Sequence, residues 1–348
     1  MQEPDGHDTG AYVRSGAWMM IRGAYMEGMI DKLRGKKKVL CAFFIVLAVG
    51  LLALAVFLSF PSGRAGENDA SSTGTVDGIY KTLEVHFLDV GQGDAALLIC
   101  GGESMLIDAG SNDSVDHLKK YLAGHGITRL KYVVGSHYDS DHVGGIDEVL
   151  SDFVVETLIV PDQERDTKSY RDVMKSFDKA RKVVTAKVGD TYTLGDATLT
   201  VFAPARNDYE ESNDFSIVLR VDHGEDSFLF TGDAQEESEK EMLDAGMDVC
   251  VDVLKVSHHG SKKSSIRQFL EAVKPRFAVI SCAKNNDYGH PHAPVLRTLR
   301  RLGAQLYRTD DQGTVICYSD GQNVVWNKEP AQSWQQGEKP AITAVPAA

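Results

Sequence analysis

Two histidines and two aspartates lie within six residues of one another, at His137, Asp139, Asp141 and His142. They directly follow an apolar run, 132–136, that predicts a buried strand. Because a strand end is rigid, one short loop can hold four ligating side chains in fixed positions. Imidazole and carboxylate groups together suit zinc, manganese or iron. Four such ligands exceed the need of one ion, so the loop predicts two divalent metal ions that share a water molecule, as in enzymes that cleave esters.

Further ligand-type residues follow other predicted strands. They are Asp108, Asp233, the pair His258 and His259, and the pair His290 and His292. Any one of them alone would more often be structural, as a helix cap is for an aspartate. Their common position just past the carboxyl ends of strands is more telling, because ligand sites of α/β sheets open there.

The elements that must position these residues begin at residue 79. We expect strands at 83–88, 95–99, 105–108, 132–136, 157–160, 199–203, 217–222, 227–231, 253–256, 277–281, 305–307 and 314–318, with a hairpin turn at 100–103 between the second and the third. We expect helices at 115–123, 145–150, 168–180, 235–245, 266–273 and 294–302. Each half is rich in strands first and alternates strand and helix later. This pattern predicts an α/β fold, a four-layer αββα sandwich over residues 79–325, with a polar C-terminal tail at 326–348.

The N-terminal part has a different texture. Residues 39–60 form an unbroken apolar run, long enough to span a bilayer as one helix, and a cluster of lysines and arginines precedes it. Positive charge stays on the cytoplasmic side, so we expect 1–38 inside and the domain outside. Residues 61–78 read as a flexible linker. The alternative is a cleaved signal sequence, which would make the domain a secreted protein.

Charge and cysteine content narrow the function. The net charge is -13, and residues 1–78 hold as many acidic as basic side chains, so the excess lies in the domain. Such a surface disfavours non-specific binding to nucleic acid, but bound metal ions could supply positive charge for a phosphate. The five cysteines form no CxxC pair, which disfavours a structural zinc site. We expect buried free thiols, with one disulfide as the alternative outside the cytoplasm.

Taken together, the motifs resemble the metallo-β-lactamase superfamily, and within it the hydrolase domain of ComEC-type competence proteins. The resemblance extends from residue 83 to about residue 318. The matching stretches are 86–95, 106–110, 136–145, 213–219, 230–234, 254–261, 286–292 and 308–313.

The resemblance implies a ligand set for two divalent metal ions, zinc or manganese. The implied ligands are His137 and Asp139 for the first ion, Asp141, His142 and His290 for the second, and Asp233 as a bridge between them. Asp108 would orient these ligands from behind. The superfamily usually has a histidine where this chain has Asn213, which weakens the first site.

The resemblance also implies catalytic and substrate-binding roles. Asp141 would act in catalysis, and His258 would donate a proton to the leaving oxygen. The implied substrate contacts are Gln92, Asn213, His259 and Ser261. Lys262 and Lys263 either add local positive charge or form a solvated pair.

The expected function is a metal-dependent hydrolase that cleaves a phosphodiester, in DNA or another nucleic acid, outside the membrane to which residues 39–60 attach it. One alternative is a hydrolase of the same fold that cleaves a lactam, a lactone or a thioester instead of a phosphodiester. Another is a surface module that binds without catalysis, which the acidic charge and Asn213 favour slightly.

Overall fold

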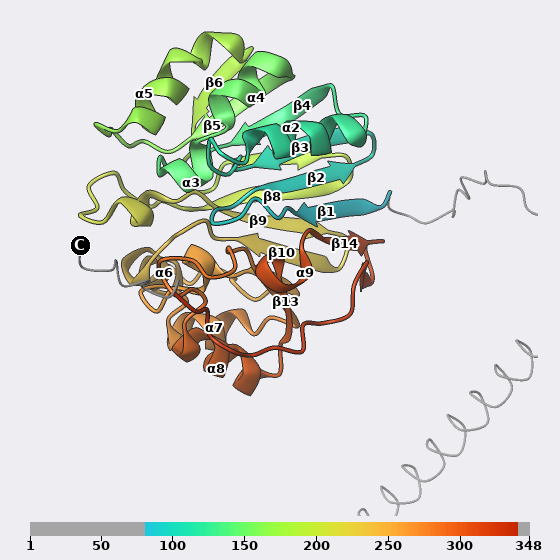
Figure 1. Ribbon diagram of the computed structural model, residues 1–348, viewed down its shortest axis with the longest axis vertical. Coiled ribbons are helices and arrows are strands. Elements are labelled where there is room, and N and C mark those ends of the chain that lie inside the picture. The colour runs from blue at the N-terminus through green and yellow to red at the C-terminus, as the bar shows by residue number, and fades with distance from the viewer. Residues whose placement is uncertain (1–80, 340–348) are drawn as a thin grey trace, which may run out of the picture. The chain divides into compact units, whose positions relative to one another are not determined.

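The computed structural model describes residues 81–339, all of them in one compact unit (Figure 1). The predicted membrane segment 39–60, with 1–38 and 61–78, lies outside the described residues, as do the last residues of the predicted tail. In the described range 81–339, no helix has the length and apolarity needed to cross a membrane.

Two sheets form the centre of the unit. The first has eight strands in the order β15-β14-β1-β2-β3-β4-β5-β6. These are β1 (Leu83–Phe87), β2 (Ala96–Cys100), β3 (Glu103–Ile107), β4 (Arg129–Val134), β5 (Val154–Val160), β6 (Lys182–Thr185), β14 (Val315–Ser319) and β15 (Val324–Trp326). The second has seven strands in the order β13-β12-β11-β10-β9-β8-β7. These are β7 (Thr191–Leu194), β8 (Ala197–Ala203), β9 (Val218–His223), β10 (Asp226–Phe230), β11 (Val253–Lys255), β12 (Phe277–Ile280) and β13 (Gln305–Arg308).

Helices cover the outer face of each sheet, so the layers run helix, sheet, sheet, helix, as the sequence predicted (Figure 1). On the first sheet lie α2 (Val115–Gly124), α3 (Ser140–Val143), α4 (Ile146–Asp152) and α5 (Lys168–Lys175). On the second lie α6 (Glu236–Asp244), α7 (Arg267–Val273) and α8 (Ala293–Leu302), with the short α9 (Thr309–Gln312) after β13. Three apolar clusters fill the three gaps between layers, and the central one contains Phe87, Leu98, Phe228 and Val279.

The strand pairing explains how the site is positioned. β3 runs parallel to β4 in the first sheet, and β10 to β13 run parallel in the second. The carboxyl ends of parallel neighbours lie at the same edge, so the loops after them meet. The hairpin expected between β2 and β3 is confirmed: Gly101 and Gly102 have φ of 59° and 80°, which a two-residue turn of this kind requires.

Some elements differ from the sequence expectation. The strands β6, β7 and β15 were not predicted, and the helix predicted over 168–180 ends at Lys175. The segment predicted as a polar tail packs against the domain as far as it is described. Ala331 is buried and Trp334 packs beside it against the helices of the second sheet, and Gly337 N donates to Pro291 O at 2.9 Å. A few apolar side chains therefore suffice to fix a segment that is polar on average.

Candidate metal centre

Loops from both sheets converge at the predicted site. The loop after β4 carries His137 to His142, and the loop after β10 carries Asp233. Two backbone hydrogen bonds hold these loops and their neighbours together: Ile217 N donates to Ser136 O at 2.8 Å, and His258 N donates to Gly232 O at 3.0 Å. These backbone hydrogen bonds alone therefore fix segments that are distant in sequence relative to one another.

His142 is held between two carboxylates. Its Nδ1 lies 2.8 Å from Asp108 Oδ2, and its Nε2 lies 3.1 Å from Asp233 Oδ1. Asp108 also accepts hydrogen bonds from Ser136 N and Ser136 Oγ, each at 2.7 Å. All of these side chains are buried. These hydrogen bonds fix the orientation of the His142 ring relative to Asp108, and the contact is compatible with the role that the family resemblance implies for Asp108.

His259 is oriented in a similar way. Its Nδ1 donates to Ser281 O at 2.9 Å, so Nε2 is the free ring nitrogen. That atom lies 3.3 Å from Asp141 Oδ2 and 3.6 Å from Asp233 Oδ2. Asp141, Asp233 and His259 therefore form a compact cluster of ligand-type atoms with His142 at its side.

His137 is fully buried. Its Nδ1 lies 3.1 Å from Ser136 Oγ and 3.3 Å from Ser216 Oγ. Its Nε2 lies 3.7 Å from Asp139 Oδ2, and its ring centroid is 4.3 Å from that of His142. The side chain thus presents Nε2 toward the cluster on the side of the predicted first metal ion.

The unsatisfied atoms of this cluster fit a metal ion. The Nε2 atoms of His137, His142 and His259 and the Oδ1 atom of Asp233 are buried without a hydrogen-bond partner. Buried polar groups are normally paired, but here His142 Nε2 and Asp233 Oδ1 meet only as an ion pair at 3.1 Å, and the Nε2 atoms of His137 and His259 make no hydrogen bond, which indicates a missing ligand. Among residues 81–339, four groups of three ligand-type residues have atoms within 4.8 Å of one another; two of them are His137, His142 and Asp233, and Asp141, His142 and His259, and the other two include Asp94. Nitrogen and carboxylate oxygen donors of this kind suit zinc, manganese or iron.

The charges in the cluster reinforce one another. Burial lowers the pKa of His142, but the negative charges of Asp233 and Asp108 outweigh it and hold that pKa well above its ordinary value. Burial would raise the pKa of Asp233, yet the charges of His142 and His259 hold it well below its usual range. Burial, with His142 as a positive neighbour, lowers the pKa of His137. These charges therefore favour the ionised form of the central carboxylate, which is the form in which a carboxylate binds a metal ion.

The predicted ligand His290 lies elsewhere. His259 takes the position expected for it, because β11, which precedes His259, pairs directly with β10, which precedes Asp233. The ring of His290 is 6.0 Å from that of His259, and among residues 81–339 His290 belongs to none of the compact ligand groups. His259, which was predicted to contact the substrate, lies in one of these groups instead.

Asp139 also differs from its predicted role. Its Oδ1 lies 3.4 Å from the Arg165 guanidinium and 3.3 Å from Ser212 Oγ, and within the described range it joins no compact ligand group. The carboxylate faces His137 through its other oxygen alone. The Arg165 guanidinium therefore competes with a metal ion for this carboxylate, and the spacing of residues in the sequence does not reveal such a partner.

The predicted proton donor His258 and the predicted substrate contact Asn213 lie beside the same cluster. His258 Nε2 lies 3.6 Å from Asp233 Oδ2, and its Nδ1 lies 3.3 Å from Asn213 Nδ2. Gln92 Oε1 accepts from Ala283 N at 3.3 Å, which leaves a buried and unpartnered Nε2. Ser261 is buried, and its Oγ accepts from Lys263 N. Asn213 thus contacts His258, and Gln92 keeps a free donor.

Sequence reasoning missed Asp94 and Lys255. Asp94 Oδ1 lies 3.4 Å from His259 Nδ1, and Asp94 Oδ2 lies 2.8 Å from Lys255 Nζ. The available signal was an acidic residue just before one buried strand and a lysine ending another, since a charge in an apolar context usually has a partner.

Backbone strain is concentrated in these loops. Asp108, His258 and His259 have φ of 58°, 49° and 54°, in the left-handed region that residues other than glycine rarely adopt. Strain of this kind persists where the surrounding structure fixes it, often at functional sites. It turns the side chains of consecutive residues, His258 and His259, to different partners.

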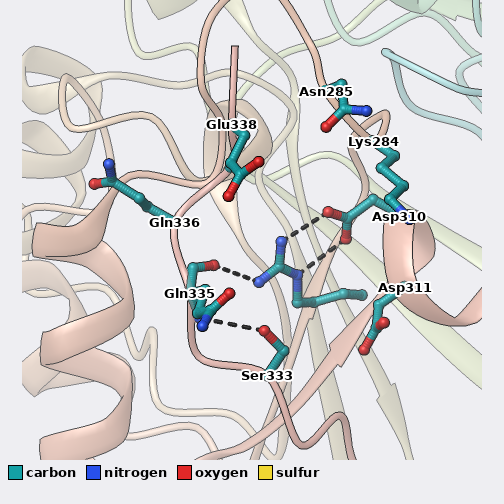
Figure 2. A pocket seen from close by; sticks show the side chains of 10 residues that line it. Lys284, Asn285, Asp310, Asp311, Ser333, Gln335, Gln336 and Glu338 are labelled. Carbon is teal, nitrogen blue, oxygen red and sulfur yellow. Dashed lines mark hydrogen bonds and ion pairs between the residues drawn. The ribbon is translucent and has the colours of Figure 1, made fainter. Parts of the chain in front are cut away.

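A separate cavity of about 220 Å³ lies between the loop after β12, the start of α9 and the C-terminal segment. Arg308 lines this cavity, and its guanidinium donates to the carboxylate of Asp310 and to the backbone carbonyl oxygen of Gln335, two residues that Figure 2 labels. None of the predicted site residues lines it. Because these hydrogen bonds occupy the buried guanidinium, we interpret the cavity as part of the structural contact between the C-terminal segment and the rest of the domain.

Comparison with known proteins agrees with this geometry. Residues 88–284 match the family model for the metallo-beta-lactamase superfamily. The chain is 31% identical over 251 residues to ComE operon protein 3 of Bacillus subtilis, a match covering 67% of the chain and 32% of the relative. It is 34% identical over 239 residues to Recombination protein 2 of Haemophilus influenzae, covering 67% and 28%. It is 29% identical over 267 residues to competence protein ComA of Neisseria gonorrhoeae, covering 76% and 34%.

The chain thus spans about a third of the length of these curated relatives. The family match covers more than half of its 348 residues and includes the loops that carry His137 and Asp233. The chain belongs to the metallo-beta-lactamase superfamily.

Proposed function

We propose that this protein is a metal-dependent phosphodiesterase that cleaves nucleic acid. The observation that carries the proposal is the set of buried Nε2 atoms of His137, His142 and His259, none of which makes a hydrogen bond, gathered around the buried carboxylate of Asp233. The names of the relatives, which are competence and recombination proteins, favour nucleic acid as the substrate. Two divalent ions, zinc or manganese, are the proposed cofactors.

The proposed ligand sets follow the geometry. His137 and Asp233 would hold the first ion, with Asp139 as a more distant carboxylate. Asp141, His142 and His259 would hold the second, with Asp233 between both. When bound, the ions would lower the pKa of a water molecule and neutralise negative charge on phosphoryl oxygens.

The chain's own residues would orient the substrate and move a proton. Gln92 has a free Nε2 donor that suits a phosphate oxygen. His258 is partly exposed beside Asp233, so its imidazole can reach the leaving oxygen. Burial lowers the pKa of His258, which makes its protonated form a stronger acid. Asn213 contacts the His258 ring and would keep it in place.

We also propose that residues 39–60 attach the domain to a membrane, with the domain on the outer side. The run of apolar residues and the basic residues before it support this placement. Protease added to intact cells would degrade the domain if the placement is right and would leave it intact if the domain is cytoplasmic.

The function can be tested with the full-length protein. Loaded with zinc or manganese, it would be offered single-stranded and double-stranded DNA, RNA, an aryl phosphodiester, a β-lactam and a lactone. We expect turnover of phosphodiesters, reduced by at least about 100-fold in Asp233→Asn, with exposed Asp113→Asn as the matched control. Turnover of the lactam or lactone alone, or binding of nucleic acid without cleavage by the metal-loaded protein, would contradict the proposal.

A further inference from the structure

The loop between β12 and α8 carries an exposed aromatic ring at the rim of the metal centre. Tyr288 is 58% exposed. Its ring stacks on that of His290, with centroids 5.4 Å apart and planes 16° from parallel. One face of the tyrosine is therefore supported, and much of the remaining surface is open to solvent.

The ring below connects this surface to the reacting groups. His290 is only 4% exposed, and its Nδ1 has no hydrogen-bond partner. Its ring centroid lies 5.5 Å from that of His258 and 6.0 Å from that of His259. A ligand lying on Tyr288 would thus be separated from His258 only by the ring of His290.

The loop is held rigidly by Asn286, which is buried. Asn286 Oδ1 accepts from His290 N at 2.9 Å and from Tyr288 N at 3.2 Å. Its Nδ2 donates to Ala283 O at 2.9 Å and to His290 O at 2.7 Å. Because one buried amide fixes both ends of the loop, the two rings are organised before a ligand arrives, which lowers the entropic cost of binding.

Positive charge lies beside these rings. Lys262 N donates to His292 Nδ1 at 3.0 Å, and the ring centroid of His292 is 4.9 Å from that of His290. The side chain of Lys339 lies against the same loop, because a Cβ atom added at Gly289 would be 3.5 Å from its Cγ. Two exposed lysines therefore lie near these rings on an otherwise acidic protein. Cationic groups next to an aromatic ring are the usual features of a groove for single strands.

We propose that Tyr288, stacked on His290, is a platform for an unpaired base of a single-stranded nucleic acid, next to the phosphate at the metal centre. The inference rests on the proposed function and adds its substrate class. Bases in a duplex are already stacked on their neighbours, so the platform favours a single strand. Lys262 and Lys339 would contact the flanking phosphates.

The test compares strands with and without bases. The probes are fluorescent, phosphorothioate-linked thymidine 12-mers, which resist cleavage, an abasic strand of the same length, and a duplex. Binding to the metal-loaded, full-length protein is measured by anisotropy at one salt concentration. We expect the base-bearing strand to bind roughly 5- to 100-fold more tightly than the abasic strand, and more tightly than the duplex.

Substitutions of Tyr288 test whether its aromatic ring accounts for the preference for strands that carry bases. Tyr288→Leu should remove most of the preference for bases, and Tyr288→Phe should keep it, because the face is retained. Val325→Ala, which changes another exposed apolar side chain on the edge strand β15, should leave the preference intact. Equal affinity for all three probes, or an unchanged preference in Tyr288→Leu, would overturn the inference.

The two proposals can fail separately. Base-dependent binding without metal-dependent hydrolysis would support the platform and contradict the nuclease. Phosphodiester hydrolysis with no preference for bases would support the nuclease and overturn the platform.

Discussion

Lys255 Nζ lies 2.8 Å from Asp94 Oδ2, and both side chains are more than nine-tenths buried. The other carboxylate oxygen of Asp94 lies 3.4 Å from Nδ1 of His259. Burial would raise the pKa of Asp94, but the charges of Lys255 and His259 hold it below its usual range. The pair therefore supports the proposed ligand His259 from the side opposite the metal.

Removing the charge of Asp94 should destabilise the fold. Asp94→Asn would leave the Lys255 ammonium buried without a counter-charge, at a cost of about 3 kcal/mol in the free energy of unfolding measured in urea. Adding Lys255→Met should recover most of that loss, since the buried charge is gone. Metal affinity, measured by chelator competition, should stay roughly 10- to 100-fold weaker in both variants. Wild-type stability of the single variant would contradict the argument.

Substitutions can show which of two histidines, His259 or His290, binds the second metal ion. His259→Ala should lower the metal content of the purified protein, because Nε2 lies 3.3 Å from Asp141 and 3.6 Å from Asp233. His290→Ala should retain it, because its ring is 6.0 Å from that of His259. Elemental analysis of both proteins gives the answer, and the reverse pattern would restore His290 as the ligand.

Close packing at Gly93 should be essential for Asp141. A Cβ atom on Gly93 would lie 2.2 Å from Asp141 O, so Gly93→Ala must displace the backbone that carries this ligand. A misplacement of about 1 Å can cost on the order of 100-fold in activity. Gly91→Ala is the matched control: its φ is also positive, yet no atom lies within 4 Å of the added carbon. Similar activity losses in both variants would argue against a specific contact.

Glu239 should make stability depend on pH. It is fully buried and accepts hydrogen bonds from Ser265 N and Ile266 N. Burial raises its pKa well above the ordinary value, although these two hydrogen bonds oppose the shift. The protonated form is thus favoured on folding. The contribution of protonated Glu239 to the free energy of unfolding is fully present below the pKa of the unfolded state, about 4.3. It is lost as pH rises through the pKa of the folded state.

The comparison with Glu239→Gln isolates this effect, because glutamine does not titrate. The free energy of unfolding of the unmodified protein, relative to that of the variant, should fall as pH rises above about 4.3. Urea denaturation at a series of pH values measures the difference. Parallel pH profiles for the two proteins would show that folding leaves the pKa of Glu239 unchanged, and would contradict the prediction.

Much of the architecture followed from local pattern. Apolar runs identified the central strands, and the Gly101–Gly102 turn identified a hairpin. The missed strands β6 and β7 lie at sheet edges and mix exposed with partly buried residues. Edge strands of this kind carry a weak apolar signal. The sequence therefore predicted the interior of each sheet better than its margins.

The choice between His259 and His290 shows a different limit. Both follow predicted strands, and nothing in their spacing ranks them. The pairing of β11 with β10 decides the matter, because it brings His259 beside Asp233. Such neighbour relations between strands are tertiary facts that a pattern along one chain does not contain.

The proposed ligands are divided between the two halves of the sandwich: His137 and His142 follow β4 of one sheet, and Asp233 and His259 follow β10 and β11 of the other. Each of the two proposed ions would be held by residues from both sheets, and would therefore link the two halves across the central apolar gap. Each tenfold rise in free ion above its dissociation constant then adds about 1.4 kcal/mol to the free energy of unfolding. Removing the ions with a chelator would weaken the contact between the two sheets at this edge first. The supply of metal would therefore control the stability of the folded protein as well as its activity.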